Sequence, residues 1–250
     1  MSHETISIRT ADGDCRAFVA TPAHAGPGDK FPPVIFFMDG LAIRPALFPM
    51  IQRIADIGYV VLMPDMFYRA GPYEPIDAKA AFASGNVRDA IAHVFGSTDN
   101  RRAAEDTAFF LDYLDSRTDI STRKVGTTGY CMGGAISLTV AGTYPDRIAA
   151  AASFHGGSLA TDDPLSPHLL VPRIRGRIVI AGAEKDQSYP IEMKARLDEA
   201  LSAAGIVYDS EIWEDMLHGW TMTDLPVYNQ GGAERHFTVL EKLFAATLHD

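Results

Sequence analysis

The residues best suited to chemistry in this chain begin with a cysteine set between glycines. Residues 129–134 read Gly-Tyr-Cys-Met-Gly-Gly, so Cys131 stands at the centre of a Gly-x-Cys-x-Gly pattern. A short apolar run, 124–129, precedes the pattern and predicts a strand, and 135–142 predicts the helix after it. At a sharp strand-to-helix turn the backbone is strained, so the neighbours two positions away have to be small. The spacing therefore predicts Cys131 as a nucleophile.

Cysteine suits this place chemically. A helix amino terminus stabilises negative charge, which favours the thiolate form that attacks a carbonyl. The backbone N–H of Met132, the next residue, is expected to point toward a developing oxyanion. Gly134 would let the helix pack close to the strand. The alternative is a glycine-rich turn that holds a buried, inert cysteine.

A histidine able to serve as the base occurs much later in the chain. His218 follows the predicted strand 208–213 and precedes the predicted helix 233–248, and Gly219 gives its loop room to turn. In enzymes with a strand-helix nucleophile of this kind, the chain order is nucleophile, acid, histidine. The alternative is a histidine on a surface loop. We expect His218 to take the proton of the Cys131 thiol.

Asp186 is the candidate for the acid of the triad. It follows the predicted strand 177–181 and precedes the predicted helix 190–204. A carboxylate there would accept a hydrogen bond from the far ring nitrogen of His218 and fix its tautomer. Glu184 is the nearest competitor, and an amino-terminal helix cap is the alternative role for Asp186.

The remaining elements predict a mostly parallel central sheet with helices on both faces, the pattern of an α/β fold. Continuous apolar runs indicate strands that are covered on both faces, and they alternate with amphipathic helices. No repeat or linker divides the chain, so we expect one domain over residues 1–250. The predicted strands are 5–10, 15–20, 34–37, 59–63 and 148–154 besides those above, and further helices are 45–57 and 102–114, with a partly helical excursion over 72–98.

Composition excludes several classes of function. The formal net charge is −10, with 32 acidic residues against 22 Lys and Arg. An acidic surface repels the phosphates of nucleic acids, so we do not expect a nucleic-acid partner. There are two cysteines, and Cys15 reads as a strand residue, so no disulfide framework is expected. No signal peptide, membrane span or metal-ligand cluster is evident. These features predict a cytoplasmic protein without a cofactor.

At these motifs the sequence resembles the dienelactone hydrolase family of the α/β-hydrolase superfamily. The match is specific at 129–134, at Asp186 with a proline four residues later, and at His218-Gly219, and looser similarity runs from Pro32 to the carboxyl terminus. The resemblance implies an α/β-hydrolase fold in a single domain. It also implies a Cys131–His218–Asp186 triad, no metal or organic cofactor, and hydrolysis of a lactone or ester.

The resemblance also implies a role for the turn after the predicted strand 34–37. Asp39 stands where the family has an acidic residue, usually glutamate, near the thiol. A nearby carboxylate disfavours the thiolate, so Asp39 could keep Cys131 protonated until substrate rearranges the site. The alternative is a plain Asp-Gly turn. Gly40, in the same loop, is expected to supply the second oxyanion N–H.

The sequence departs from the family in the region expected to bind the substrate. The family archetype binds a carboxylate with arginines, one of them shortly after the histidine, whereas residues 219–224 here contain none. Arg44 and Arg69 lie near loops expected to line the site, and Trp220 could form a pocket wall. The alternatives are surface charge for the arginines and an ordinary core aromatic for Trp220. A bulkier or less charged ester or lactone is therefore expected.

The predicted function is hydrolysis of a small ester or lactone through an acyl-thioester on Cys131. Acyl transfer or thioester cleavage by the same triad is an alternative, and so is a ligand-binding protein that kept the fold without catalysis. The expected partner is a small-molecule substrate, and neither nucleic acid nor a membrane is expected. The protein is expected as a monomer or a small homo-oligomer. His155-Gly156-Gly157 resembles an oxyanion loop, but it follows the nucleophile and reads as a strand-to-loop connection.

Overall fold

Eight strands form one sheet in the order β1-β2-β4-β3-β5-β6-β7-β8 in the computed structural model, which describes residues 3–74, 76–84 and 86–249. β1 and β2 form the antiparallel hairpin predicted at the amino terminus, and β2 also pairs antiparallel with β4. The other neighbours, from β4 through β3 to β8, all pair in parallel. The strands are β1 Glu4–Thr10, β2 Gly13–Ala20, β3 Pro33–Phe37, β4 Val60–Pro64, β5 Val125–Tyr130, β6 Ile148–Phe154, β7 Arg177–Ala183 and β8 Tyr208–Trp213.

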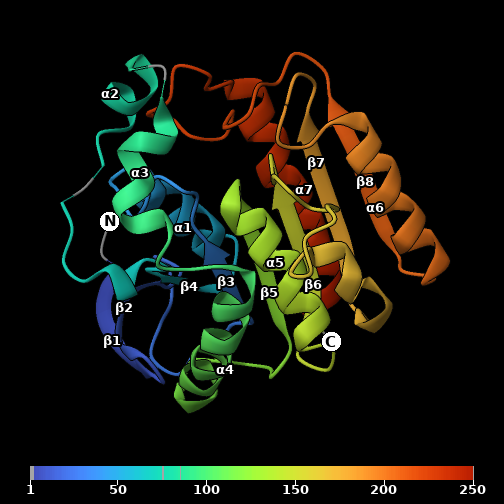
Figure 1. Cartoon of the computed structure of the whole chain (residues 1–250). Helices are drawn as coiled ribbons and strands as arrows, with labels where there is room; N and C mark the ends of the chain where they lie inside the picture. Colours follow the sequence, from blue (N-terminus) through green and yellow to red (C-terminus); the bar gives the residue numbers. More distant parts are fainter. Residues whose placement is uncertain (1–2, 75, 85, 250) are drawn as a thin grey trace.

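Helices cover both faces of this sheet, which confirms the predicted α/β-hydrolase architecture. Figure 1 shows α4 and α5 in front of the sheet and α7 behind it. Arg53 of α1 pairs with Glu234 of α7, so α1 lies on the same face as α7. The α-helices are α1 Leu47–Asp56, α2 Ala78–Ala83, α3 Val87–Phe95, α4 Asn100–Ser116, α5 Met132–Thr143, α6 Ile191–Ala203 and α7 Gln230–Leu248, and the 3-10 helices are η1 Tyr68–Ala70 and η2 Pro167–Arg173.

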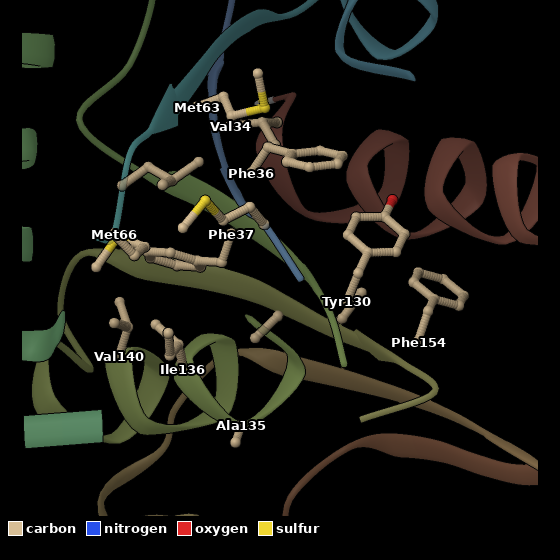
Figure 2. Packing of buried hydrophobic residues seen from close by; sticks show 14 of the residues in the cluster. Val34, Phe36, Phe37, Met63, Met66, Tyr130, Ala135, Ile136, Val140 and Phe154 are labelled. Atoms are coloured by element: carbon tan, nitrogen blue, oxygen red, sulfur yellow. The ribbon is translucent and has the colours of Figure 1, made fainter. Parts of the chain in front are cut away.

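The continuous apolar runs of the central strands result from this double cover. All five residues of β3 and all five of β4 are buried, as parallel strands between two helical layers must be. Figure 2 shows Ile136 and Val140 of α5 on one side of the sheet and Tyr130 and Phe154 on the other. On that second side the Tyr130 hydroxyl lies 2.7 Å from Nε2 of His236 on α7, which satisfies a buried polar group.

The parallel strands place five loops at one edge of the sheet. Because β3, β5, β6, β7 and β8 run in the same direction, the residues that follow their carboxyl ends meet at that edge. Those residues include Asp39 after β3, Cys131 after β5, His155 after β6, Asp186 after β7 and His218 after β8. The topology therefore brings together side chains that are up to 179 positions apart in the chain, from Asp39 to His218.

The structure extends the sequence-based predictions at several helix ends. α4 begins at Asn100 because the side chain of Asp99 accepts a hydrogen bond from the N–H of Arg102, at 2.8 Å. α5 begins at Met132, directly after the nucleophile candidate, and not at 135. η2 was not predicted from the sequence. The excursion over 72–98 contains α2 and α3, and its positions 75 and 85 lie outside the described residues. Across the described residues, no helix combines the length and hydropathy needed to cross a bilayer.

Candidate active site

Cys131 occupies a strained turn between β5 and α5. Its backbone angles are φ 54° and ψ −115°, and it is the N-cap residue of α5. A Cβ atom on Gly129 would lie 1.8 Å from the carbonyl oxygen of Gly133, and one on Gly133 would lie 2.2 Å from the carbonyl oxygen of Phe37. Larger residues at either position would force the turn apart, so the glycines are what allow this conformation. The thiol-bearing residue is half-buried and lines a cavity.

His218 and Asp186 form the second part of the site. His218 Nδ1 lies 2.6 Å from Asp186 Oδ2. The other carboxylate oxygen of Asp186 accepts hydrogen bonds from the N–H and the hydroxyl of Ser188, at 2.8 and 2.6 Å. Glu184, the competing acid, instead accepts a hydrogen bond from the N–H of Asp215 at 3.0 Å. Geometry therefore favours Asp186 as the partner of His218.

The charges around His218 favour its protonated form. Burial by itself lowers the pKa of the ring, but the electrostatic interaction with Cys131 and the hydrogen bond with Asp186 outweigh burial and raise the pKa of His218 to about 10. Burial likewise opposes the ionised form of Asp186, yet the hydrogen bonds from His218 and Ser188 hold its pKa below the ordinary value. The arrangement favours a protonated imidazole with an ionised carboxylate behind it.

Two backbone amides face the same cavity as Cys131. Met132 is the first residue of α5, where a helix has no internal acceptor for its N–H groups. Gly40 follows Asp39 in the turn after β3, and Gly40 and Met132 both line the cavity. Neither amide donates a hydrogen bond to another group within the described part of the chain. This arrangement is compatible with the predicted oxyanion hole.

Asp39 is held by a buried arginine and not left free beside the thiol. Arg44 donates two hydrogen bonds to Asp39, at 2.6 and 2.9 Å, and two to Asp224, at 2.6 and 3.3 Å. The side chains of Arg44 and Asp39 are only 2% and 4% exposed. Asp39 Oδ1 also accepts from the N–H of Leu41 at 2.9 Å, so the carboxylate fixes the turn that contains Gly40. Arg44 thus joins the turn after β3 to the loop after His218.

The residues predicted to bind substrate lie elsewhere. Arg44 is occupied by its two carboxylates, and Arg69 pairs with Asp106 and Asp12, both at 2.7 Å. Neither arginine is among the described residues that line the cavity. Trp220 is fully buried and does not line the cavity either; its ring packs against that of His155, with centroids 5.0 Å apart. The structure therefore does not place these three residues at the site, and Trp220 takes the alternative role of a core aromatic.

Two further residues lie at the site: His155, which the sequence analysis interpreted only as part of a strand-to-loop connection, and Ser188, which it did not consider. The ring of His155 lies edge-on to that of His218, with centroids 5.3 Å apart, and its Nε2 is 2.8 Å from Oγ1 of Thr221. Burial first, and then the charge of His218, holds the pKa of His155 well below its ordinary value, so His155 is neutral. Its position after β6, between the strands that carry Cys131 and Asp186, was a signal available from strand order. Ser188, two residues after the acid, offered a weaker one.

Cys131, His155, Ser188 and His218 line a cavity of about 860 Å³. Among the described residues, no three His, Cys, Asp or Glu side chains are placed to hold a metal ion. Other residues that line the cavity come from α2, α3, the first turns of α5 and the segment that follows β6; they include Phe82, Val87, Arg88, Ile91, Phe95, Ala135, Ile136, Thr161, Asp163 and Leu165.

A sheet of this order with a strained nucleophile turn defines an α/β-hydrolase fold, and comparison with known proteins identifies the family. The model of the dienelactone hydrolase family matches residues 15–248. The chain therefore belongs to the dienelactone hydrolase family, and the protein is a hydrolase.

Individual relatives are distant in sequence. A Methylorubrum extorquens protein, provisionally named a carboxymethylenebutenolidase, is 22% identical over 242 residues, 96% of this chain and 79% of the relative. The carboxymethylenebutenolidase homolog of Mus musculus is 26% identical over 172 residues, 68% of this chain and 62% of the relative. The family model, which covers most of the chain, shows the membership, while about four in five positions differ from the longer of these two matches.

Solved structures show the same fold. A dienelactone hydrolase-like promiscuous phosphotriesterase from metagenomic libraries superposes with a TM-score of 0.77 at 20% identity, covering 100% of both chains. The dienelactone hydrolase from Anabaena variabilis gives a TM-score of 0.65 at 15% identity, covering 99% of both chains. At these identities the likeness concerns the fold alone.

The first prediction concerns the charge of His218. Because the negative charge of Cys131 raises the pKa of His218, the Cys131→Ala variant should titrate at a lower pH than the native protein, by at least about one pH unit. The midpoint is measured by NMR on the His218 Cε1 proton between pH 5 and 10. Since the folded pKa lies above the unfolded value, the associated stability is full below about pH 6.5 and is lost as the pH rises toward 10. Equal midpoints in the two proteins would contradict the ion pair.

The second prediction concerns Arg44. Replacing Arg44 by Met removes the partner of a buried carboxylate, so the free energy of unfolding should fall by about 3–5 kcal/mol. Arg53→Met is the matched control, because Arg53 pairs with Glu234 at the surface and its loss should cost less than about 1 kcal/mol. Urea denaturation measures both. Similar losses of unfolding free energy in the two variants would show that the Asp39–Arg44–Asp224 pairing does not stabilise the site.

Proposed function

We propose that this protein hydrolyses an ester or lactone with Cys131 as nucleophile, His218 as proton carrier and Asp186 as the acid that orients it. The observation that supports the proposal is the placement of Cys131 and His218 on one cavity, with Asp186 bonded to the far nitrogen of His218 at 2.6 Å. The hydrolase family of the chain and the carboxymethylenebutenolidase names of its relatives agree with this chemistry.

In the first step the Cys131 sulfur attacks the carbonyl carbon of the substrate. A carbon–sulfur bond forms, and the electron pair of the carbonyl double bond moves to its oxygen. The N–H groups of Met132 and Gly40 would donate to this oxyanion, as the position of both on the cavity allows. The thiol proton is already on His218 before attack, which the raised pKa of that ring favours.

In the second step the tetrahedral intermediate collapses to a thioester. The carbon–oxygen bond of the ester breaks, and the leaving alkoxide takes the proton from Nε2 of His218. In a lactone the alcohol stays attached to the acyl group, so nothing leaves the site at this stage. Once Cys131 is acylated, its negative charge is gone and the main cause of the high pKa of His218 is removed.

In the third step His218, now neutral, accepts a proton from a water molecule that attacks the thioester carbonyl. Collapse of the second intermediate breaks the carbon–sulfur bond and releases the carboxylic acid and the Cys131 thiolate. Asp186 keeps the ring in one orientation throughout, because its other oxygen is fixed by Ser188. The thiolate–imidazolium pair is then restored without any further proton source.

For Asp39 we propose a positioning role in place of a proton switch. Its two oxygens are engaged by Arg44, and Oδ1 also binds the N–H of Leu41. A carboxylate held this way keeps the turn that contains Gly40 in place, which an oxyanion donor requires. Movement of Asp39 toward the thiol would have to break a buried ion pair first.

The third prediction tests the nucleophile. Cys131→Ala should lower kcat for p-nitrophenyl acetate by at least about 10³-fold, since the sulfur forms the covalent intermediate. Cys15→Ala is the matched control, because Cys15 is the other cysteine and is buried in β2, so activity should stay within about twofold. Steady-state kinetics gives the rates, and mass spectrometry of the quenched native enzyme should show an acetyl adduct on Cys131. Near-native turnover by Cys131→Ala would reject the proposal.

The fourth prediction tests the acid. Asp186→Asn should lower kcat by about 10⁴-fold at neutral pH, because an amide stabilises the wrong tautomer of His218 and cannot balance its charge. Glu184→Gln, in the same loop, keeps an acceptor for the N–H of Asp215 and should retain native kcat. The two variants are compared on p-nitrophenyl acetate, with circular dichroism as a check of folding. An equal effect of both changes would show that the loop matters and the charge of Asp186 does not.

A further inference from the structure

The cavity above Cys131 is larger than a small ester needs. Its volume of about 860 Å³ lies in the upper part of the range of roughly 300–1,000 Å³ that holds drug-sized ligands. The reacting carbonyl occupies only the region beside Cys131 and Gly40. The rest of the space has to accommodate another part of the substrate, and its walls indicate what that part is.

One wall is an apolar stripe on α3. Val87, Ile91 and Phe95 are spaced four residues apart, so they lie on one face of the helix, and all three line the cavity. A Cβ atom placed on Gly40 would lie 3.4 Å from the Phe95 ring and 3.5 Å from Cδ1 of Ile91. The stripe therefore lies directly beside the proposed oxyanion donor, where it could contact a group attached to the reacting carbonyl.

The facing wall is also apolar. Ala135 and Ile136, in the first turns of α5, line the cavity on the side of Cys131, and Leu165 lines it from the segment after β6. The side-chain amide of Asn100 donates to the carbonyl oxygen of Leu165 at 3.2 Å, which ties this segment to the start of α4, the helix that follows α3. The two walls are thus connected beyond the end of the stripe.

The rim of the cavity carries large apolar side chains whose exposure to water is unfavourable. Phe95 is 43% exposed and Leu165 is 40% exposed. Exposed apolar side chains that border a cavity are typical of a surface that a ligand covers. Contact with an apolar substrate group would remove both from water.

The charges on the lining do not favour an anionic substrate. Among the described residues of the lining, Arg88 is the one arginine or lysine, and the carboxylates there are Asp39, Asp99 and Asp163. Arg44 pairs with Asp39 and so balances its charge. Asp163 accepts a hydrogen bond from the N–H of Leu165, which places a carboxylate beside the rim of the cavity. An uncharged group is therefore the better fit for this space.

We propose that the substrates are esters or lactones that carry an uncharged apolar group of about six carbons or more, and that the α3 stripe and Leu165 determine this specificity. The proposal rests on the proposed function, since it concerns the second binding region of the same site. It assigns α3 a role in substrate choice that is separate from the reacting residues.

The test compares kcat/KM of the native enzyme across two series of esters. One series lengthens the acyl group, with p-nitrophenyl acetate, butyrate and hexanoate, and the other lengthens the alcohol, with ethyl, butyl and hexyl acetate. In at least one series kcat/KM should rise by about threefold for each added methylene. A flat or falling profile in both series would overturn the proposal.

A matched pair of variants locates the specificity. Leu165→Ser should lower the ratio of kcat/KM for the hexyl substrate to that for the short one by at least about threefold, since it removes an apolar contact from the cavity. Leu169→Ser changes a leucine that is 53% exposed, lies in η2 and is not among the lining residues, so the ratio should stay native. An unchanged ratio in Leu165→Ser, or an equal loss in both variants, would reject the assignment.

These outcomes separate the two proposals. If the native enzyme hydrolyses none of the esters, or if Cys131→Ala hydrolyses them all as well, the proposed function itself is wrong. If acetate is hydrolysed through Cys131 but longer chains bring no gain in either series, only the apolar specificity is wrong.

Discussion

The structure depends on one steric constraint, the close approach of β5 and α5 at Cys131. A carbonyl oxygen occupies the place where a side chain at Gly129 would begin, and another occupies the corresponding place at Gly133. Only with hydrogen at both positions can the chain turn at φ 54° and present a side chain above the sheet. The cost of that strained residue is offset by the buried packing of β5 and α5 on either side of it.

Around this turn the site is organised by charge. His218 pairs with the carboxylate of Asp186, and its interactions with Asp186 and Cys131 raise its pKa in spite of burial. A second set of charges lies on the other side, where Arg44 joins Asp39 to Asp224. The turn after β3 and the loop after β8 are therefore linked by an ion pair that contacts neither the thiol nor the imidazole.

Family membership and the cavity bear on different properties of the protein, the first on its general chemistry and the second on its choice of substrate. Membership in the dienelactone hydrolase family explains the fold and identifies the protein as a hydrolase. The lining of the cavity is a property of this chain, because α3 and the segment after β6 contribute its apolar walls. We propose that the chemistry follows from the first and the choice of substrate from the second. Residues 219–224, directly after His218, contain no arginine, and Asp224 in this stretch is a partner of Arg44.

The order of strands and helices along the chain, the turn at Cys131 and the candidates His218 and Asp186 could be predicted from local patterns, namely hydrophobic period, glycine spacing and position after a strand. Which charged side chains pair with one another depends on the folded arrangement. Arg44, Arg69 and Trp220 have residue types suited to a binding site, but the sequence cannot show that two carboxylates pair with Arg44 or that Trp220 is fully buried. Contacts between residues distant in the chain depend on side-chain packing across strands, which no local pattern contains.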